Sequence, residues 1–173
     1  MKPVAFPEGF HLATLERRHR RKAFDCGESA VNDWLCTRAL QNQDKHLSTT
    51  KVLLTVDDGI AGFYTLATGQ VDFSDLPPDL SRGLPRRALP VAILAWLGVD
   101  QRFHGQGIGD RLLAHSLRDC HTADKTFAFI AVVLDCLNDH AKSFYQRWDF
   151  QELPGSPYRL FLTVQTLNAL MKT

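Results

Sequence analysis

The sequence predicts a mixed α/β fold whose sheet is centred on two apolar strands. Residues 91–99 and 127–134 are the two most apolar segments of strand length, and a helix-like segment lies between them. Strand-like and helix-like segments alternate over the rest of the chain, which is typical of this fold class. No internal repeat or linker divides the sequence, so we expect one domain over residues 1–173.

The N-terminal half predicts a short strand, a helix and a hairpin. Residues 11–15 suit the strand, and Asp25 is a plausible N-cap for a helix that runs to about residue 43. The helix carries one apolar stripe, formed by Val31, Trp34, Leu35 and Ala39. Residues 51–56 and 60–67 predict two strands, because Asp57-Asp58-Gly59 between them is a good hairpin turn.

The second half begins with an irregular segment. Residues 72–90 contain four of the eight prolines, at positions 77, 78, 85 and 90, and prolines at this density disfavour regular structure. The expected elements after it are strand 91–99, helix 108–120, strand 127–134, helix 138–147, strand 160–164 and helix 166–172. The helix 108–120 places Leu112, Leu113 and Leu117 on one face.

Composition excludes several classes of protein. The chain has 173 residues, 45% hydrophobic and 23% charged, as ordinary globular domains do. No apolar run approaches the ~20 residues of a membrane span, and residues 1–7 lack the apolar stretch of a signal peptide. We therefore expect a cytoplasmic protein without a membrane partner. The four cysteines form no C-x-x-C pair, so neither a metal site nor a disulfide framework is expected.

Basic residues are gathered in two places although the net charge is only +1. Residues 17–22 read Arg17-Arg18-His19-Arg20-Arg21-Lys22, and Arg82, Arg86 and Arg87 form a second cluster. Such runs are usually solvated surface. On a nearly neutral chain, a local patch that binds a polyanion is the alternative hypothesis.

A glycine-rich turn stands between the strand 91–99 and the following helix. Its sequence is Gly105-Gln106-Gly107-Ile108-Gly109. Glycine permits sharp turns and close approach of a ligand, and the first turn of a helix presents unpaired N–H groups that favour negative charge. Phosphate or pyrophosphate suits such a turn. The pattern is not a Walker loop, since no Gly-Lys-Ser/Thr follows, and a purely structural turn is the other interpretation.

Two segments resemble the signatures of the GNAT superfamily of N-acetyltransferases. The first is Leu97-Gly98-Val99-Asp100 with Phe103-His104-Gly105-Gln106-Gly107-Ile108-Gly109-Asp110-Arg111, similar to the acetyl-CoA loop. The second is Asn138-Asp139-His140-Ala141-Lys142-Ser143-Phe144-Tyr145 followed by Asp149-Phe150. The resemblance implies a GNAT fold: a mixed, mostly antiparallel sheet with splayed central parallel strands, here 91–99 and 127–134, flanked by helices.

The likeness extends to the acetyltransferase toxins of toxin–antitoxin pairs, over roughly residues 12–165. It is carried by Ala23-Phe24-Asp25-Cys26-Gly27-Glu28-Ser29-Ala30 with Trp34-Leu35, by Gly62-Phe63-Tyr64-Thr65-Leu66-Ala67 and by Asp135-Cys136-Leu137-Asn138-Asp139-His140-Ala141. That group acetylates the amino acid carried by aminoacyl-tRNA, blocks translation, and is neutralised by a ribbon-helix-helix antitoxin. A homodimer is also implied by the family.

The chain departs from these relatives at four positions. The superfamily prefers Arg or Gln at the position of His104 and Gly at that of Asp149. The toxin group more often has Arg and Ala where this chain has Trp96 and Gly98.

The resemblance assigns roles to the residues that match. Backbone groups of Leu97 and Val99 are expected to hold the pantetheine arm of acetyl-CoA, with Asn138 nearer the sulfur. The expected pyrophosphate loop consists of His104, Gly105, Gln106, Gly107, Ile108, Gly109 and Asp110. Tyr145 is the expected general acid, because a phenol with a pKa of about 10 is protonated at neutral pH and can protonate the leaving thiolate. Packing in the core beside Phe144 is the alternative role.

The acceptor requires no strong base. A free α-amine has a pKa of about 7.7–8.0, and esterification of the carboxyl group lowers it further. Glu28, Asp135 and His140 are possible bases, each more readily explained as structural. The expected phosphate contacts for tRNA are Arg17, Arg18, Arg20, Arg21, Lys22, Arg86 and Arg87.

Two other functions remain open at this point. One is acetylation of a small amine or a protein N-terminus. An acidic, narrow acceptor pocket would indicate a small amine. The other is a non-catalytic role, as a CoA-binding regulator or as a partner in the binding of operator DNA, which the glycine turn and Tyr145 together disfavour.

Overall fold

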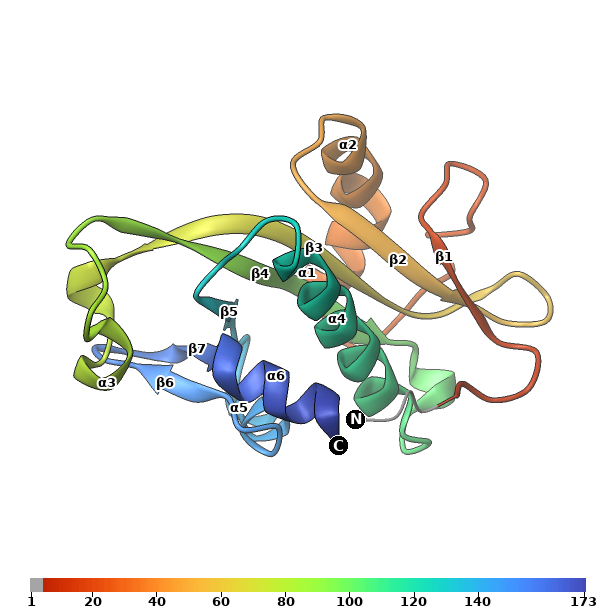
Figure 1. Ribbon diagram of the computed structural model, residues 1–173. Coiled ribbons are helices and arrows are strands. Elements are labelled where there is room, and N and C mark those ends of the chain that lie inside the picture. The colour runs from red at the N-terminus through yellow and green to blue at the C-terminus, as the bar shows by residue number, and fades with distance from the viewer. Residues whose placement is uncertain (1–4) are drawn as a thin grey trace. The chain divides into compact units, whose positions relative to one another are not determined.

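The computed structural model describes residues 5–173, and its seven strands form a sheet in the order β1-β2-β3-β4-β5-β7-β6 (Figure 1). The described chain groups into two compact units. We call residues 5–67 and 94–117 the N-terminal unit, and residues 68–93 and 118–173 the C-terminal unit. A single domain over 1–173 stays a prediction, and residues 1–4 lie outside the described part.

Three antiparallel strands make up the sheet of the N-terminal unit. They are β1 (His11–Thr14), β2 (Thr49–Leu54) and the first part of β3 (Ile60–Asp72). The expected hairpin is confirmed, but its turn begins earlier than expected. Thr55 N–H donates to the Gly59 carbonyl (2.9 Å), and Asp58 takes a left-handed φ of 60°. β2 therefore ends at Leu54 rather than at residue 56.

The helical segment of this unit has three parts: α1 (Ser29–Asp33), a π-helical turn (Trp34–Arg38) and α2 (Ala39–Asp44). Its start at Ser29 corrects the expected cap. Asp25 Oδ1 instead accepts from Gly27 N–H and Asn32 Nδ2, both at 2.9 Å, and so shapes the preceding turn. The apolar stripe is confirmed, because Val31, Leu35 and Ala39 are buried in a core with Phe63.

The unit is completed by the last part of β4 (Ala88–Val99), a 3₁₀ turn (Gln101–Phe103) and the first part of α4 (Ile108–Asp124). The face of α4 expected to be apolar is fully buried at Leu112, Leu113 and Leu117. None of the described helices is long and apolar enough to cross a membrane.

The C-terminal unit contains the parallel pair of strands. β4 pairs with β5 (Ala131–Asp135) through Ala92–Val132 and Ile93–Val133, while β7 (Ser156–Thr163) runs antiparallel to both β5 and β6 (Gln151–Leu153). The remaining elements are a 3₁₀ turn (Phe73–Asp75), α3 (Pro78–Ser81), α5 (Asp139–Gln146) and α6 (Val164–Lys172). Val91, Val133 and Phe161 belong to the core of this unit.

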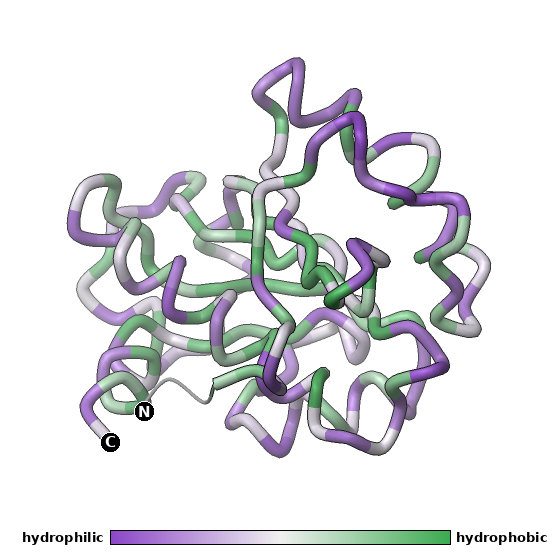
Figure 2. The backbone as a smooth tube through the Cα atoms, turned by 90° about the vertical axis from the view of Figure 1, so that its right-hand side faces the viewer, coloured by the Kyte–Doolittle hydropathy of each residue, from purple (hydrophilic) through white to green (hydrophobic). Residues whose placement is uncertain are grey.

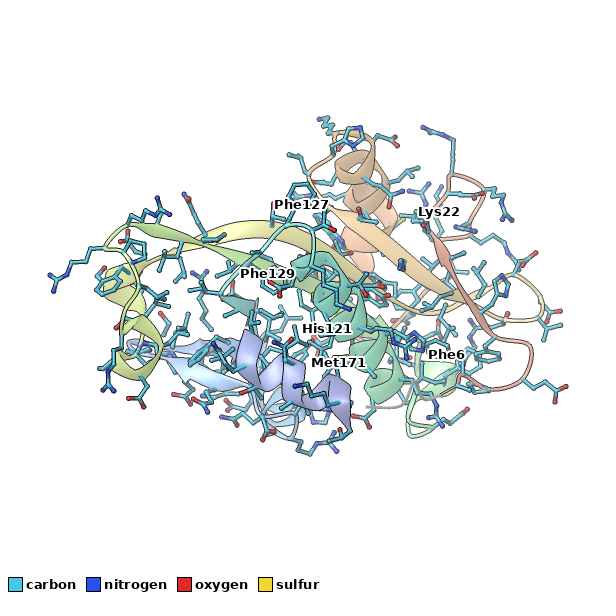
Figure 3. The ribbon with its side chains drawn as sticks, in the orientation of Figure 1. Phe6, Lys22, His121, Phe127, Phe129 and Met171 are labelled. Atoms are coloured by element: carbon cyan, nitrogen blue, oxygen red, sulfur yellow. The ribbon has the colours of Figure 1, made fainter. Side chains whose placement is uncertain are left out.

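Two expectations for this unit need correction. The strand expected from residue 127 begins at Ala131, because Phe127 N–H donates to the Ala123 carbonyl (2.8 Å) and Phe127 therefore belongs to the turn that follows α4. Its side chain, labelled in Figure 3, is 79% exposed. The strand expected over residues 160–164 begins already at Ser156, because β7 forms a short hairpin with the three-residue strand β6 that turns at Gly155, where φ is 75°. Figure 2 shows hydrophilic residues mainly along the outer bends of the tube and hydrophobic residues mainly in the segments between them.

Candidate active site

The glycine turn adopts a backbone that requires glycine. Gly105 has a φ of 76° and Gly107 a φ of 75°, both in the left-handed region that other residues rarely occupy. A Cβ atom on Gly107 would lie 2.6 Å from Arg111 Nη1, whereas a Cβ on Gly105 would meet nothing within 4 Å. The turn is therefore tight at Gly107 and open at Gly105, where a ligand can approach the backbone closely.

Arg111 fastens this turn to the start of α4. Its Nη1 donates to the carbonyls of Gln106 (3.2 Å) and Gly107 (3.1 Å), and its Nε donates to the Ala5 carbonyl (3.0 Å). The guanidinium therefore pairs with carbonyl oxygens of the turn by hydrogen bonds. The 17-residue helix α4 begins at this turn, where Arg111 N–H donates to the Gly107 carbonyl (3.2 Å). The N–H groups in the first turn of a helix generally have no intrahelical acceptor and point toward its N-terminal end. This set of donors suits a pyrophosphate.

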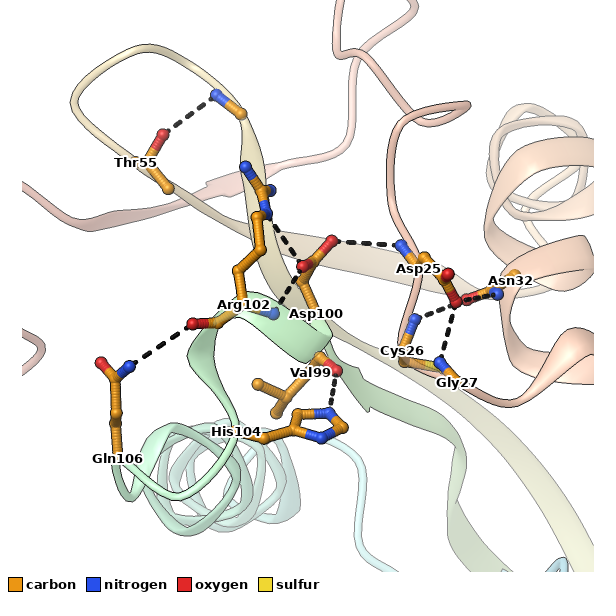
Figure 4. Close-up of polar contacts among 11 residues, drawn as sticks. Asp25, Cys26, Gly27, Asn32, Thr55, Val99, Asp100, Arg102, His104 and Gln106 are labelled. Carbon is orange, nitrogen blue, oxygen red and sulfur yellow. Dashed lines mark hydrogen bonds and ion pairs between the residues drawn. The ribbon is translucent and has the colours of Figure 1, made fainter.

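Asp100 joins the end of β4 to the segment before α1, as Figure 4 shows. Its side chain is buried and accepts from Asp25 N–H (3.1 Å), from Arg102 N–H (3.0 Å) and from Arg102 Nε (2.9 Å). Burial opposes ionisation, but the hydrogen bonds from Arg102 and Asp25 outweigh it and lower the pKa of Asp100. The aspartate thus stays ionised and holds the loop in place.

His104 braces the same loop. It is exposed, and its Nε2 donates to the Val99 carbonyl over 2.7 Å (Figure 4). Since that nitrogen is engaged with the strand, the structure gives His104 a role in fixing the turn. Leu97 and Val99 are half-buried on β4. Their contact with pantetheine stays a prediction, as does that of the loop with pyrophosphate.

Tyr145 lies on α5 in the C-terminal unit and is 9% exposed. Its ring packs edge-on against Phe144 (centroids 5.1 Å apart) and Phe150 (5.8 Å). Burial raises the pKa of the phenol, and the nearby Cys136 adds to this. The group is accordingly protonated at any physiological pH, as a general acid must be. The packing with Phe144 given as the alternative role is confirmed, and the role of Tyr145 as general acid stays a prediction.

Asn138 caps the helix that carries Tyr145. Its Oδ1 accepts from Ala141 N–H over 2.9 Å. Of the three possible bases, Asp135 is paired with Arg159 through Oδ1 to Nε (2.8 Å) and Oδ2 to Nη2 (3.1 Å). Glu28 and His140 are exposed. Asp149, at the position where the superfamily resemblance leads us to expect glycine, takes a left-handed φ of 69°, a conformation that glycine adopts without strain.

The basic residues of the N-terminal unit are engaged to different degrees. Arg18 pairs with Glu16 (2.7 Å) and Arg17 with Asp44 (4.0 Å), so part of their charge is compensated. Arg20 and Arg21 donate to the carbonyls of Asp57 and Cys36, which leaves their charge intact. Lys22 is exposed (Figure 3).

The predicted site residues divide between the two units. Leu97, Val99, the loop from His104 to Asp110 and the basic run 17–22 belong to the N-terminal unit, while Asn138, Tyr145, Arg86 and Arg87 belong to the C-terminal unit. Arg86 lies over the Phe73 ring at 5.7 Å. Sequence reasoning missed Arg111 and Asp100, although both stand within the quoted signature. Residues 5–173 contain no cluster of three His, Cys, Asp or Glu side chains able to hold a metal ion.

Comparison with known proteins gives a consistent result. Residues 48–152 match the acetyltransferase (GNAT) domain. A tRNA-acetylating toxin of Mycobacterium tuberculosis is 33% identical over 86% of this chain and 89% of its own length. The probable toxin TacT of Sinorhizobium fredii is 32% identical over 89% of this chain and 90% of its own.

Solved structures agree in fold. A tyrosine-to-phenylalanine mutant of the protein KacT superposes with a TM-score of 0.87 at 26% identity, covering 94% of this chain and 99% of KacT. AtaT complexed with acetyl-methionyl-tRNAfMet has a TM-score of 0.86 at 24% identity, with coverage of 94% and 99%. The predictions of a GNAT fold, of acetyltransferase activity and of acetyl-CoA as the donor are confirmed, and the chain belongs to the GNAT acetyltransferase family.

Proposed function

We propose that this acetyltransferase is a toxin that transfers the acetyl group of acetyl-CoA to the α-amino group of an aminoacyl-tRNA and so blocks translation. The similarity to a tRNA-acetylating toxin over 86% of the chain carries this proposal. The chemistry supports it as well, because Tyr145 is buried and protonated and can therefore donate a proton to a leaving group.

The reaction follows from the properties of the two reacting groups. The neutral amine attacks the thioester carbonyl, a C–N bond forms, and the C–S bond breaks as the thiolate departs. Tyr145 gives its phenolic proton to the departing sulfur and regains a proton that the former amine loses through water. No strong base is needed, because the ester lowers the pKa of the acceptor amine towards neutrality.

The loop residues Gly105 to Asp110 would hold the pyrophosphate, and Leu97 and Val99 the pantetheine arm. The contacts that the basic residues make within the protein suggest which of them are best suited to bind tRNA phosphates. Arg20, Arg21 and Lys22 keep their full charge, so they are better suited to phosphate than Arg18, which is neutralised by Glu16. Arg86 and Arg87 are exposed on the C-terminal unit and complete the proposed set.

Neutralisation by a ribbon-helix-helix antitoxin, a homodimer, one domain over residues 1–173 and a cytoplasmic location belong to the same proposal. The antitoxin and the homodimer follow from the toxin resemblance stated above, and the single domain and the location from the composition and organisation of the sequence. The AtaT toxin, whose fold is similar at 22% identity and a TM-score of 0.82, binds the C-terminus of the antitoxin AtaR.

Growth of cells that express the protein tests the proposal. The wild-type chain should slow growth, and Tyr145→Phe, which keeps the ring packed against Phe144 and Phe150, should not. Equal amounts of both proteins in the soluble fraction are the control. Normal growth with the wild type, or equal inhibition by both, would count against a catalytic toxin and in favour of a small-amine or protein acceptor.

A further inference from the structure

Gly98 lets α1 lie unusually close to the end of β4. A Cβ atom at this position would be 2.8 Å from Val31 Cγ1 and 3.2 Å from the Phe63 ring. Any side chain would therefore push the helix away from the strand. The close approach places the residue that follows α1, Trp34, against the strand residue Trp96.

Trp34 and Trp96 form a stacked pair within the N-terminal unit. Their ring centroids are 5.3 Å apart, and the ring planes differ by 12°. Both side chains pack against the core, yet each remains only half-buried, whereas Leu35 and Phe63 beneath them are fully buried. The pair thus leaves part of its aromatic surface exposed at the edge of the core.

The position of Trp34 is fixed by polar contacts. Its Nε1 donates to Thr65 Oγ1 (3.2 Å), which lies 2.7 Å from Thr50 Oγ1, and both threonines are fully buried. Trp34 also opens the π-helical turn Trp34–Arg38, a distortion that is frequent at functional sites. Since the indole N–H of Trp34 is used inside the protein, the ring offers only apolar contact.

The pair adjoins the strand segment proposed to hold the donor. Trp96 immediately precedes Leu97 on β4, about 3.3 Å along the strand. An acceptor amine must reach the thioester held by that segment. A rigid aromatic surface beside it is therefore placed to contact whatever group the acceptor carries next to its amine.

We propose that the Trp34–Trp96 pair is a specificity determinant, an apolar wall that favours aminoacyl-tRNAs with apolar side chains. The inference rests on the proposed function and adds the class of amino acid. The wall rewards apolar contact area and gives an anionic side chain no favourable contact, because the faces of the indole rings carry partial negative charge. Differences in apolar contact of this kind discriminate substrates by roughly 10- to 200-fold.

The experiment compares kcat/KM for glycyl-, methionyl-, phenylalanyl- and aspartyl-tRNA. The wild type should prefer methionyl- and phenylalanyl-tRNA over the other two by about tenfold or more. Trp96→Ala should lose this preference mainly through KM, and Trp96→Phe should keep most of it. Phe127→Ala, which removes an exposed ring elsewhere, is the matched control and should leave the preference unchanged.

The ratio between acceptors does not depend on the fraction of folded enzyme, so a destabilised variant still gives a valid answer. If the wild type acetylated all four aminoacyl-tRNAs equally, or preferred glycyl-tRNA, the proposed role of the Trp34–Trp96 pair would be contradicted. A Trp96→Ala variant that loses activity equally on all four would contradict it as well. Failure to acetylate any of the four would instead overturn the proposed function, and this inference with it.

Discussion

Tyr145 and Cys136 show how burial selects the chemistry available at a residue. Burial raises the pKa of the Cys136 thiol to about 11 and also raises that of Tyr145. Cys136 is therefore a thiol and a poor nucleophile at neutral pH, which disfavours an acetyl-cysteine intermediate. Tyr145 keeps the proton that the leaving thiolate needs. Direct transfer from acetyl-CoA to the amine is the mechanism that fits both side chains.

His19 stands apart from the other residues of the basic run because it is 4% exposed. Its Nδ1 accepts from Glu16 N–H over 2.9 Å, and the described residues offer its Nε2 no hydrogen-bond partner. Burial lowers the pKa of His19, and Arg18 adds to the effect. Glu16 and Asp58 oppose the shift, and His11 adds to it.

The lowered pKa predicts a loss of stability in mild acid. The unfolded chain takes up the proton at a pKa of about 6.5, while the folded chain resists it, so the free energy of unfolding should fall as pH drops below about 6.5. His19→Asn keeps an acceptor for Glu16 N–H and removes the titration, so it should flatten this dependence. Urea unfolding of both proteins at pH 5.5 and 7.5 measures it. If the free energy of unfolding changed by the same amount between these two pH values in both proteins, His19 would not contribute to the pH dependence of stability.

At the scale of elements, the glycine turn and the start of α4 form the proposed binding site for the pyrophosphate of acetyl-CoA. Gly105 lies in open space, Gly107 lies against Arg111, and Arg111 holds the carbonyls of the turn. The conformation needs glycine at both positions, but only at Gly105 does the surrounding space admit a ligand.

Alanine substitutions separate backbone strain from ligand binding. Gly83 has a φ of 80° with nothing within 4 Å of a Cβ, so it matches Gly105 in strain and lies far along the chain from the turn. Gly105→Ala and Gly83→Ala should each lower the free energy of unfolding by about 1–2 kcal/mol. Only Gly105→Ala should raise the Kd for acetyl-CoA, by an expected tenfold or more, as titration calorimetry would measure. Equal affinity of both variants for acetyl-CoA would show that the turn is not part of the donor site.

The sequence predicts elements better than it predicts the contacts between them. The strand 91–99, the helix after the glycine turn and the glycines themselves follow from local pattern. The predicted N-cap of the first helix was wrong, because the Asp25 carboxylate accepts hydrogen bonds from Gly27 and Asn32 instead. The contacts of Asp100 with Asp25 and of Trp34 with Trp96 join residues more than 60 positions apart. No local periodicity reports such pairs.

At the scale of the whole molecule, a net charge of +1 makes non-specific attraction to RNA weak. Binding of tRNA must then depend on local clusters, where each uncompensated cation that meets a phosphate displaces a counterion. Pairing within the protein decides which cations remain available. Arg18 and Lys22 differ in this respect although they lie four residues apart.

The salt dependence of tRNA affinity tests that distinction. Lys22→Gln should reduce the slope of log Kd against log salt concentration by about one, because one phosphate contact is lost. Arg18→Gln should change it much less, since Glu16 already neutralises this charge. Filter binding between low and moderate salt measures both slopes. A larger effect of Arg18→Gln than of Lys22→Gln would reverse the proposed order of contacts.

The most direct test of the account is the mass of the amino acid recovered from tRNA after incubation with the enzyme and acetyl-CoA. The wild type should yield the N-acetylated aminoacyl ester, and Tyr145→Phe should form it about 10²- to 10⁴-fold more slowly, with acetyl-CoA affinity nearly unchanged. An unmodified amino acid with the wild type, or equal rates for the two proteins, would contradict acetyl transfer to aminoacyl-tRNA with Tyr145 as the acid.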